Sequence, residues 1–215
     1  KFPCEMAQTL RIRGREVLPI VQGGMGIGVS AHRLAGAVAA AGGVGTLSSV
    51  ELRRHHPDLM QATARLRDKA AIEQANLVAL DREIRRAREI AGGRGMIAVN
   101  VMRAVSQYVG YVRQSCLSGA DAIVAGAGLP LDLPELTVDF PRVALIPILS
   151  ETRAVGLLLR KWMKKGRLPD AIVIEHPRLA GGHLGAARLE ELSDARFDFE
   201  RVIPESLAIM ESLGI

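Results

Sequence analysis

Short apolar runs alternate along the chain with segments of helical pattern, and this alternation restricts the fold more than any other feature. A run of four to six residues rich in β-branched side chains is too short for a helix and is typical of a strand buried on both faces of a parallel sheet. Six strand and helix units in strict order predict an α/β fold. The expected strands lie within residues 18–21, 44–48, 96–101, 121–128 with their glycine turn, 143–148 and 171–174.

The helical segments have recognisable boundaries. Ser30 can cap a helix over residues 31–41 that Gly42 and Gly43 close, and Pro204 suits the first position of a last helix through Leu213. Between them we expect two helices within residues 57–90 with a break near 68–71, one over 108–118 and one over 152–164.

A doubly wound sheet and a (β/α)8 TIM barrel both fit this order of elements. We favour the barrel, because residues suited to function follow several strands and not one switch point: Gln22, Asn100, Ser150, Glu175 and His183. The run GMGIGVSA resembles a dinucleotide fingerprint, but no acidic residue closes the second strand about 20 residues on. We therefore expect one barrel domain over residues 1–215, with about six of its eight strands present and the C-terminal part missing.

Composition narrows the function classes. Aromatic residues make up 3% of the chain, too few for a surface that stacks bases, so we expect no nucleic-acid partner in spite of a net charge of +5. No apolar stretch is long enough to span a membrane. Cys4 and Cys116 have neither disulfide-framework nor zinc-ligand spacing, which predicts no metal site and a reducing, cytoplasmic location.

The segment after the last apolar run is the first candidate for chemistry. Glu175 and His176 follow the expected strand, and His183 stands between Gly181-Gly182 and Gly185. Glycines let a backbone approach a ligand closely, and an imidazole with a pKa of about 6.5 can act as a general acid or base near neutral pH. His32 is expected on a helix surface, His55 and His56 in a helix-entry loop, and His176 either beside His183 or at a turn.

Four sequence elements together resemble the nitronate monooxygenase (2-nitropropane dioxygenase) family. They are residues 19–25 (PIVQGGM), 40–45 (AAGGVG), Val99-Asn100, and above all residues 180–185 (AGGHLG). The resemblance implies a (β/α)8 barrel with noncovalent FMN. It also implies that His183 is catalytic and faces the substrate, and that the cofactor is bound by Gln22, Gly23, Gly24, Met25, Asn100, Glu175, Gly181 and Gly182.

The family resemblance also implies an activity, the oxidation of nitronates or nitroalkanes with O2 in which His183 is the general base or orients the substrate. The related FMN-dependent enoyl-acyl-carrier-protein or quinone reductases, which use NAD(P)H, are the alternative enzyme class. A third alternative is an inactive barrel fragment or interaction subunit. Self-association stays open, and in the family the FMN phosphate is held by the last two strands, which the six expected strands do not include.

Overall fold

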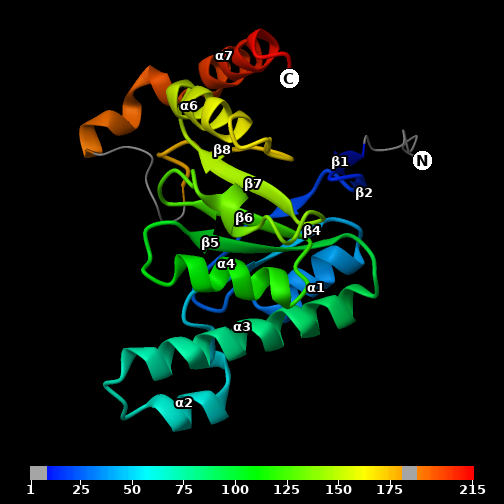
Figure 1. The fold of residues 1–215 in the computed structure, drawn as a ribbon, viewed down its shortest axis with the longest axis vertical. Coiled ribbons are helices and arrows are strands. Elements are labelled where there is room, and N and C mark those ends of the chain that lie inside the picture. The colour runs from blue at the N-terminus through cyan, green and yellow to red at the C-terminus, as the bar shows by residue number, and fades with distance from the viewer. Residues whose placement is uncertain (1–8, 181–187) are drawn as a thin grey trace, which may run out of the picture.

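The sheet of the computed structural model confirms the α/β fold and decides between the two expected architectures. The structure describes residues 9–180 and 188–215, and within them six parallel strands lie in sequential order, β3-β4-β5-β6-β7-β8. A doubly wound sheet would reverse its strand order part-way, whereas a barrel does not. The strands form a curled half-barrel (Figure 1), and their bounds are β3 Val21–Gln22, β4 Val44–Ser48, β5 Met96–Met102, β6 Ala122–Gly126, β7 Ala144–Leu149 and β8 Val173–Ile174.

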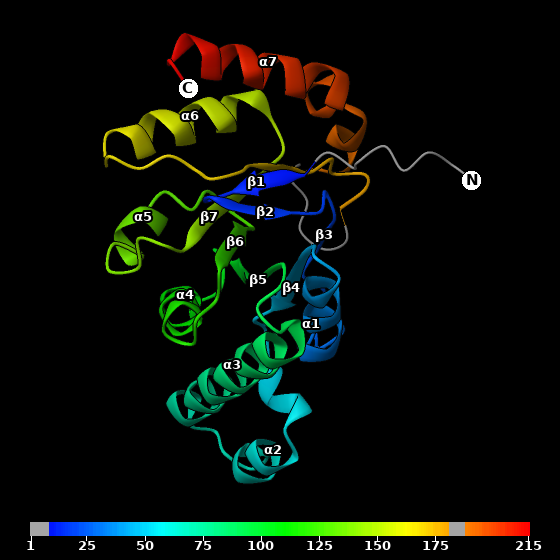
Figure 2. The ribbon, with the colours of Figure 1, turned by 90° about the vertical axis from the view of Figure 1, so that its right-hand side faces the viewer.

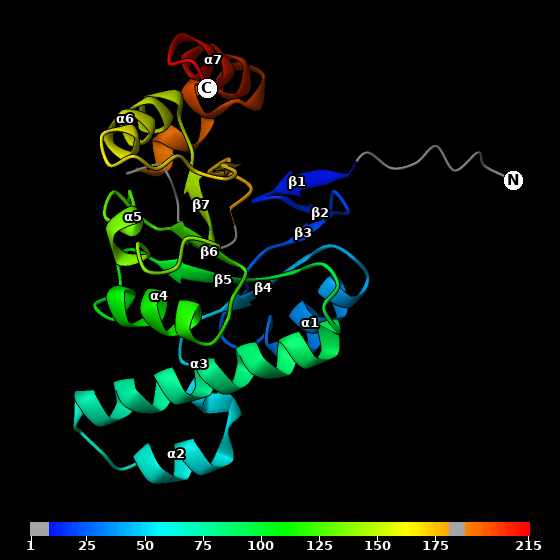
Figure 3. The same ribbon diagram turned by 45° about the vertical axis from the view of Figure 1, so that its right-hand side comes forward.

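Helices follow the strands and cover the outer face of the curled sheet. In Figure 1, α1, α3 and α4 lie along its lower side, and α6 lies along its upper side with α7 beside it. Figure 3 shows α2 next to the first half of the long α3. The helix bounds are α1 His32–Ala40, α2 Pro57–Thr63, α3 Lys69–Ala91, α4 Tyr108–Leu117, α5 Leu133–Leu136, α6 Thr152–Met163 and α7 Phe199–Ser212, with 3-10 turns η1 Leu52–His55, η2 Leu189–Ser193 and η3 Ala195–Phe197.

Strand side chains alternate strictly between two apolar cores. On β5, Ile97, Val99 and Val101 face the helices, while Met96 and Ala98 point into the barrel. The neighbouring strands repeat the alternation in register, so that Ala98, Ala122 and Ala144 form one interior layer. Asn100 takes the next inward position of β5. A polar residue therefore lies in the barrel interior near the carboxyl-terminal end of the strands.

A β-hairpin closes the opposite, amino-terminal end of the barrel (Figure 2). Its strands are β1 Leu10–Ile12 and β2 Arg15–Val17, and the turn residues Arg13 and Gly14 have φ of 48° and 79°. Positive φ at both positions is what a type I′ turn requires. Ile12 and Val17 are buried in the barrel-interior core. The sequence does not predict this hairpin, because strands of three residues carry almost no periodicity.

Two aspartates tie this hairpin to the sheet. Asp121 accepts the backbone N–H of Ile97 through Oδ2 at 2.8 Å and forms an ion pair with Arg15. Asp170 does the same with the N–H of Leu145, also at 2.8 Å, and with Arg13. Both aspartates begin the sequence Asp-Ala-Ile-Val, at residues 121–124 and 170–173, so one short motif performs the same task at two strand starts.

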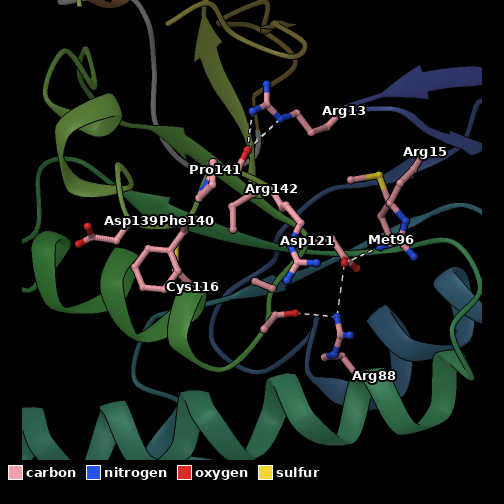
Figure 4. A pocket seen from close by; sticks show the side chains of 13 residues that line it. Arg13, Arg15, Arg88, Met96, Cys116, Asp121, Asp139, Phe140, Pro141 and Arg142 are labelled. Carbon is pink, nitrogen blue, oxygen red and sulfur yellow. Dashed lines mark hydrogen bonds and ion pairs between the residues drawn. The ribbon is translucent and has the colours of Figure 1, made fainter.

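A hollow of about 820 Å³ lies at this amino-terminal end and not among the predicted site residues (Figure 4). Figure 4 shows the guanidinium groups of Arg15 and Arg88 converging on Asp121, while Arg13 donates to the carbonyl oxygen of Pro141 at 3.1 Å. The charges of Arg15, Arg88 and Asp121 are paired, and the hollow lies at the amino-terminal ends of the strands. This hollow therefore serves the stability of the barrel and is not a candidate for chemistry.

Three expectations about local structure were wrong. Ser30 does not cap α1: its hydroxyl bonds the backbone of Met25 instead. Pro204 lies inside α7, which starts at Phe199, because buried Phe197 and Val202 anchor the segment before it. His32 is not on a free helix surface, since its ring bonds the buried carboxylate of Glu83. None of the helices in residues 9–180 and 188–215 is long and apolar enough to cross a membrane.

Candidate functional site

A hollow of about 500 Å³ opens at the carboxyl ends of the parallel strands, where barrel enzymes keep their chemistry. Five of the residues predicted to bind the cofactor line it: Gly23, Gly24, Met25, Asn100 and Glu175. They come from the loop after β3, from β5 and from the residue after β8, so the fold brings together positions more than 150 residues apart in sequence. The rest of its wall is Gly26, Ser48, Val50, Met102, Gly126, Ala127 and Ile148.

Gln22 lies beside the hollow and not in its wall. Its carboxamide Oε1 accepts the backbone N–H of Thr46 and its Nε2 donates to the carbonyl oxygen of Thr46, both at 3.1 Å. The side chain thus extends the two-residue strand β3 along β4. In the structure Gln22 fixes where the glycine loop begins.

The glycine loop, residues 23–30, is held in a closed turn. The hydroxyl of Ser30 accepts the N–H of Met25 at 2.7 Å, and the carbonyl oxygen of Ser30 accepts the N–H of Ser48 at 3.1 Å. Within the described part of the chain the amides of Gly24 and Gly26 donate to no other residue. Two donors beside the hollow are therefore free for a ligand.

Gly24 requires the absence of a side chain. A Cβ atom there would lie 2.5 Å from Cβ of Asn100, closer than real Cβ contacts, and one at Gly26 would lie 3.2 Å from the hydroxyl of Ser48. The glycines thus let the loop backbone lie directly against β4 and β5. Any side chain at Gly24 has to displace the loop or Asn100.

Asn100 is the polar group nearest the centre of the site. Its backbone carbonyl accepts the N–H of Ser49 at 3.2 Å, but its carboxamide forms no hydrogen bond with any residue that the structure describes. A carboxamide offers both donors and an acceptor. The carboxamide of Asn100 can therefore form hydrogen bonds with the polar edge of a bound ring.

Two non-glycine residues in the left-handed conformation follow strands at this end of the barrel. Glu51, three residues after β4, has φ of 51°, and Ala127, directly after β6, has φ of 56° and lines the hollow. Conformations of this kind are uncommon and gather at functional sites. Partial burial opposes ionisation of Glu51, but hydrogen bonds from Arg54 and Asn76 hold its pKa below the usual value.

The last predicted group begins at Glu175, whose N–H donates to the carbonyl oxygen of Leu149 at 2.8 Å. His176 turns away from the hollow: its Nδ1 accepts the N–H of Arg178 at 3.1 Å, and its ring packs edge-on against Phe199. It therefore stabilises the turn, one of its two expected roles. His183, Gly181 and Gly182 lie outside the described residues, and Ser150 does not line the hollow.

Sequence reasoning missed several wall residues, among them Ser48, Gly126 and Ile148. Ser48 and Gly126 could have been predicted, because each ends its strand. In the sheet register Ser48 pairs with Asn100, and Gly126 pairs with Met102. Among the described residues no group of three His, Cys, Asp or Glu side chains is arranged for a metal ion.

Comparison with known proteins identifies the family of the chain. The sequence matches the family model for nitronate monooxygenase over residues 12–209, which is nearly the whole chain. The chain belongs to the nitronate monooxygenase family. A comparison with curated proteins gave no match.

Solved structures show a fold similar to that of this member of the nitronate monooxygenase family. FabK from Thermotoga maritima is 19% identical with a TM-score of 0.52, covering 78% of this chain and 43% of its own, and a mutant of it is 20% identical with a TM-score of 0.55, covering 78% and 45%. The chain thus spans less than half the length of FabK. A nitroalkane oxidase from Streptomyces ansochromogenes is 17% identical, with 79% and 68% covered, at a TM-score of only 0.33.

Proposed function

We propose that the chain is an FMN-dependent oxidoreductase that oxidises nitronates or nitroalkanes with O2, and that it binds the flavin ring and the substrate. One observation supports it most directly. The glycine loop, Asn100 and Glu175, which the family resemblance assigns to FMN, line one hollow at the carboxyl ends of the strands. Its volume of about 500 Å³ is within the range of small-molecule and cofactor sites.

The residues present fit a flavin ring. Gly24 and Gly26 leave no room for a Cβ atom against Asn100 and Ser48, and their amides, which donate to no described residue, suit a ligand edge rich in acceptors. In this proposal Gly23, Gly24 and Met25 pass along the ring, Asn100 hydrogen-bonds it, and Glu175 with Gly181 and Gly182 lines the ribityl side. Gln22 acts by fixing the loop.

FMN would supply the acceptance of an electron pair from the substrate and its transfer to O2. The chain supplies the proton chemistry: for a nitroalkane, His183 removes the proton α to the nitro group, and for a nitronate it orients the nitro oxygens. His183 lies outside the described residues, so this role rests on the family resemblance.

Titration with FMN followed by anaerobic reduction tests the proposal. We expect the purified chain to quench FMN fluorescence and the bound flavin to be bleached by a nitronate but not by NADH. His183→Asn should keep the quenching and lose the bleaching. Rapid bleaching by NADH would instead indicate the enoyl-thioester or quinone reductase class. A chain that binds no FMN and associates stably with another protein would be an interaction subunit, and the proposal would be wrong.

A further inference from the structure

A buried carboxylate joins the two loops on the β3–β4 side of the site. Glu83 lies in the middle of α3 and is 1% exposed. Its Oε2 accepts the backbone N–H of His32 and lies 2.7 Å from Nδ1 of the same residue, and its Oε1 lies 3.0 Å from Nε2 of His56. His32 begins α1, and His56 directly precedes α2. One side chain therefore contacts the ends of two segments that are 24 residues apart.

Glu83 gives α1 a cap that its own sequence does not provide. The N-cap residue Ala31 has no side-chain hydrogen bond, and no acidic residue lies in the first turn. The first amides of a helix need acceptors, and a negative charge there is favourable. The carboxylate of Glu83 fulfils both needs from another helix, which fixes where α1 starts and so where the glycine loop ends.

The His56 side of the same cluster also contacts the glycine loop, through the neighbouring residue His55. His55, next to His56, lies against Gly28: a Cβ atom there would be 1.6 Å from Nε2 of His55. Gly28 has φ of 69°, a conformation suited to glycine. The loop that places Gly24 and Gly26 in the hollow thus rests on η1 and ends at α1, and Glu83 holds both.

The composition of this cluster favours a positioning role over a purely stabilising one. Buried charged groups are often no more stabilising than apolar side chains of the same volume, and in some proteins they specify one arrangement. Burial would raise the pKa of Glu83, yet the hydrogen bonds from His32 keep it below its usual value, so the carboxylate is charged at neutral pH. A charged acceptor with three defined contacts selects one relative placement of α1 and η1.

We propose that Glu83, through His32 and His56, is a positioning residue that sets the geometry of the glycine loop and thereby the affinity of the site for FMN. This inference rests on the proposed function. The probe is FMN itself, with two readouts: the Kd from quenching of flavin fluorescence, and the visible circular dichroism of the bound flavin at saturation, which reports the surroundings of the ring.

The variant Glu83→Gln keeps the size of the side chain and removes its charge, and Glu89→Gln, an exposed residue on the same helix, is the matched control. We expect Glu83→Gln to weaken FMN binding about ten-fold, by analogy with the lower end of the effect of residues that orient the ligands of metal sites, and to change the dichroism of the bound flavin. Glu89→Gln should bind as the wild type does.

The outcomes separate the inference from the proposed function. An unchanged Kd and an unchanged spectrum in Glu83→Gln would overturn the positioning role even if its melting temperature fell. If Glu83→Gln does not fold, His56→Gln, which removes one arm only, must show the same weakening or the inference is wrong. Absence of FMN binding by the wild type would overturn the proposed function, and this inference with it.

Discussion

The carboxylate of Asp170 accepts the backbone N–H of Leu145 at 2.8 Å, while the N–H of Asp170 donates to the carbonyl oxygen of the same residue at 3.0 Å. Asp121 and Ile97 form the same pair of bonds, each at 2.8 Å. In both cases the side chain completes the hydrogen bonding of the neighbouring strand at its first residues and still binds an arginine of the hairpin. The barrel end is therefore held by these carboxylates in addition to the buried side chains of Ile12 and Val17.

Asp121→Ala should lower the free energy of unfolding by about 2–3 kcal/mol, because it leaves the amide of Ile97 without its side-chain acceptor and removes the ion pairs with Arg15 and Arg88. Urea unfolding measures the change. Asp139→Ala is the control, since Asp139 is exposed and lines the same hollow without an ion pair in the described residues. Equal loss in both variants would show that the contacts of Asp121 do not matter.

Gly24→Ala should weaken FMN binding strongly while leaving the fold in place. The added methyl group would lie 2.5 Å from Cβ of Asn100, so the loop or Asn100 has to move out of the hollow. Fluorescence titration with FMN measures the effect. Gly110→Ala on α4, where a Cβ atom meets nothing closer than 3.7 Å, should bind as the wild type does. Full affinity in Gly24→Ala would contradict the proposed location of the ring.

Acidification should destabilise the Glu83 cluster. Burial lowers the pKa of His56 below its usual value of 6.5, so the unfolded chain binds the proton more readily than the folded one. The free energy of unfolding should therefore be highest above about pH 6.5 and fall as the pH drops below it. Unfolding in urea at pH 7.5 and 5.5 gives the difference, which His56→Gln should reduce. A variant that loses as much stability as the wild type would show that His56 is not responsible.

Cys116 should not react with thiol reagents in the folded protein. It is 6% exposed, and burial raises its pKa to about 12, so almost no thiolate forms at pH 8. In a Cys4→Ser background, Ellman's reagent should modify Cys116 slowly in buffer and rapidly in urea. Equal rates under both conditions would mean that α4 opens readily.

The sequence predicted the elements with regular patterns and missed those defined by contacts. β4 has the expected bounds, and the two helices within residues 57–90 separate close to the expected break. Five predicted site residues meet because they share the rule that parallel strands end at one face. The hairpin strands were too short to recognise, and the capping of α1 escaped notice because Glu83, its acceptor, lies about 50 residues further along the chain.

The arginine pairs of the hairpin also have a consequence for how the chain reaches its fold. Arg13 and its carboxylate partner, Asp170, are 157 positions apart, and at ribosomal speeds of about 5–20 residues per second roughly 10–30 s pass between their synthesis. Until Asp170 has been synthesised, the hairpin lacks this contact at the amino-terminal end of the barrel. Contacts of such long range slow folding, so a nascent chain of this protein exposes its apolar barrel interior for longer than a helical bundle of equal length.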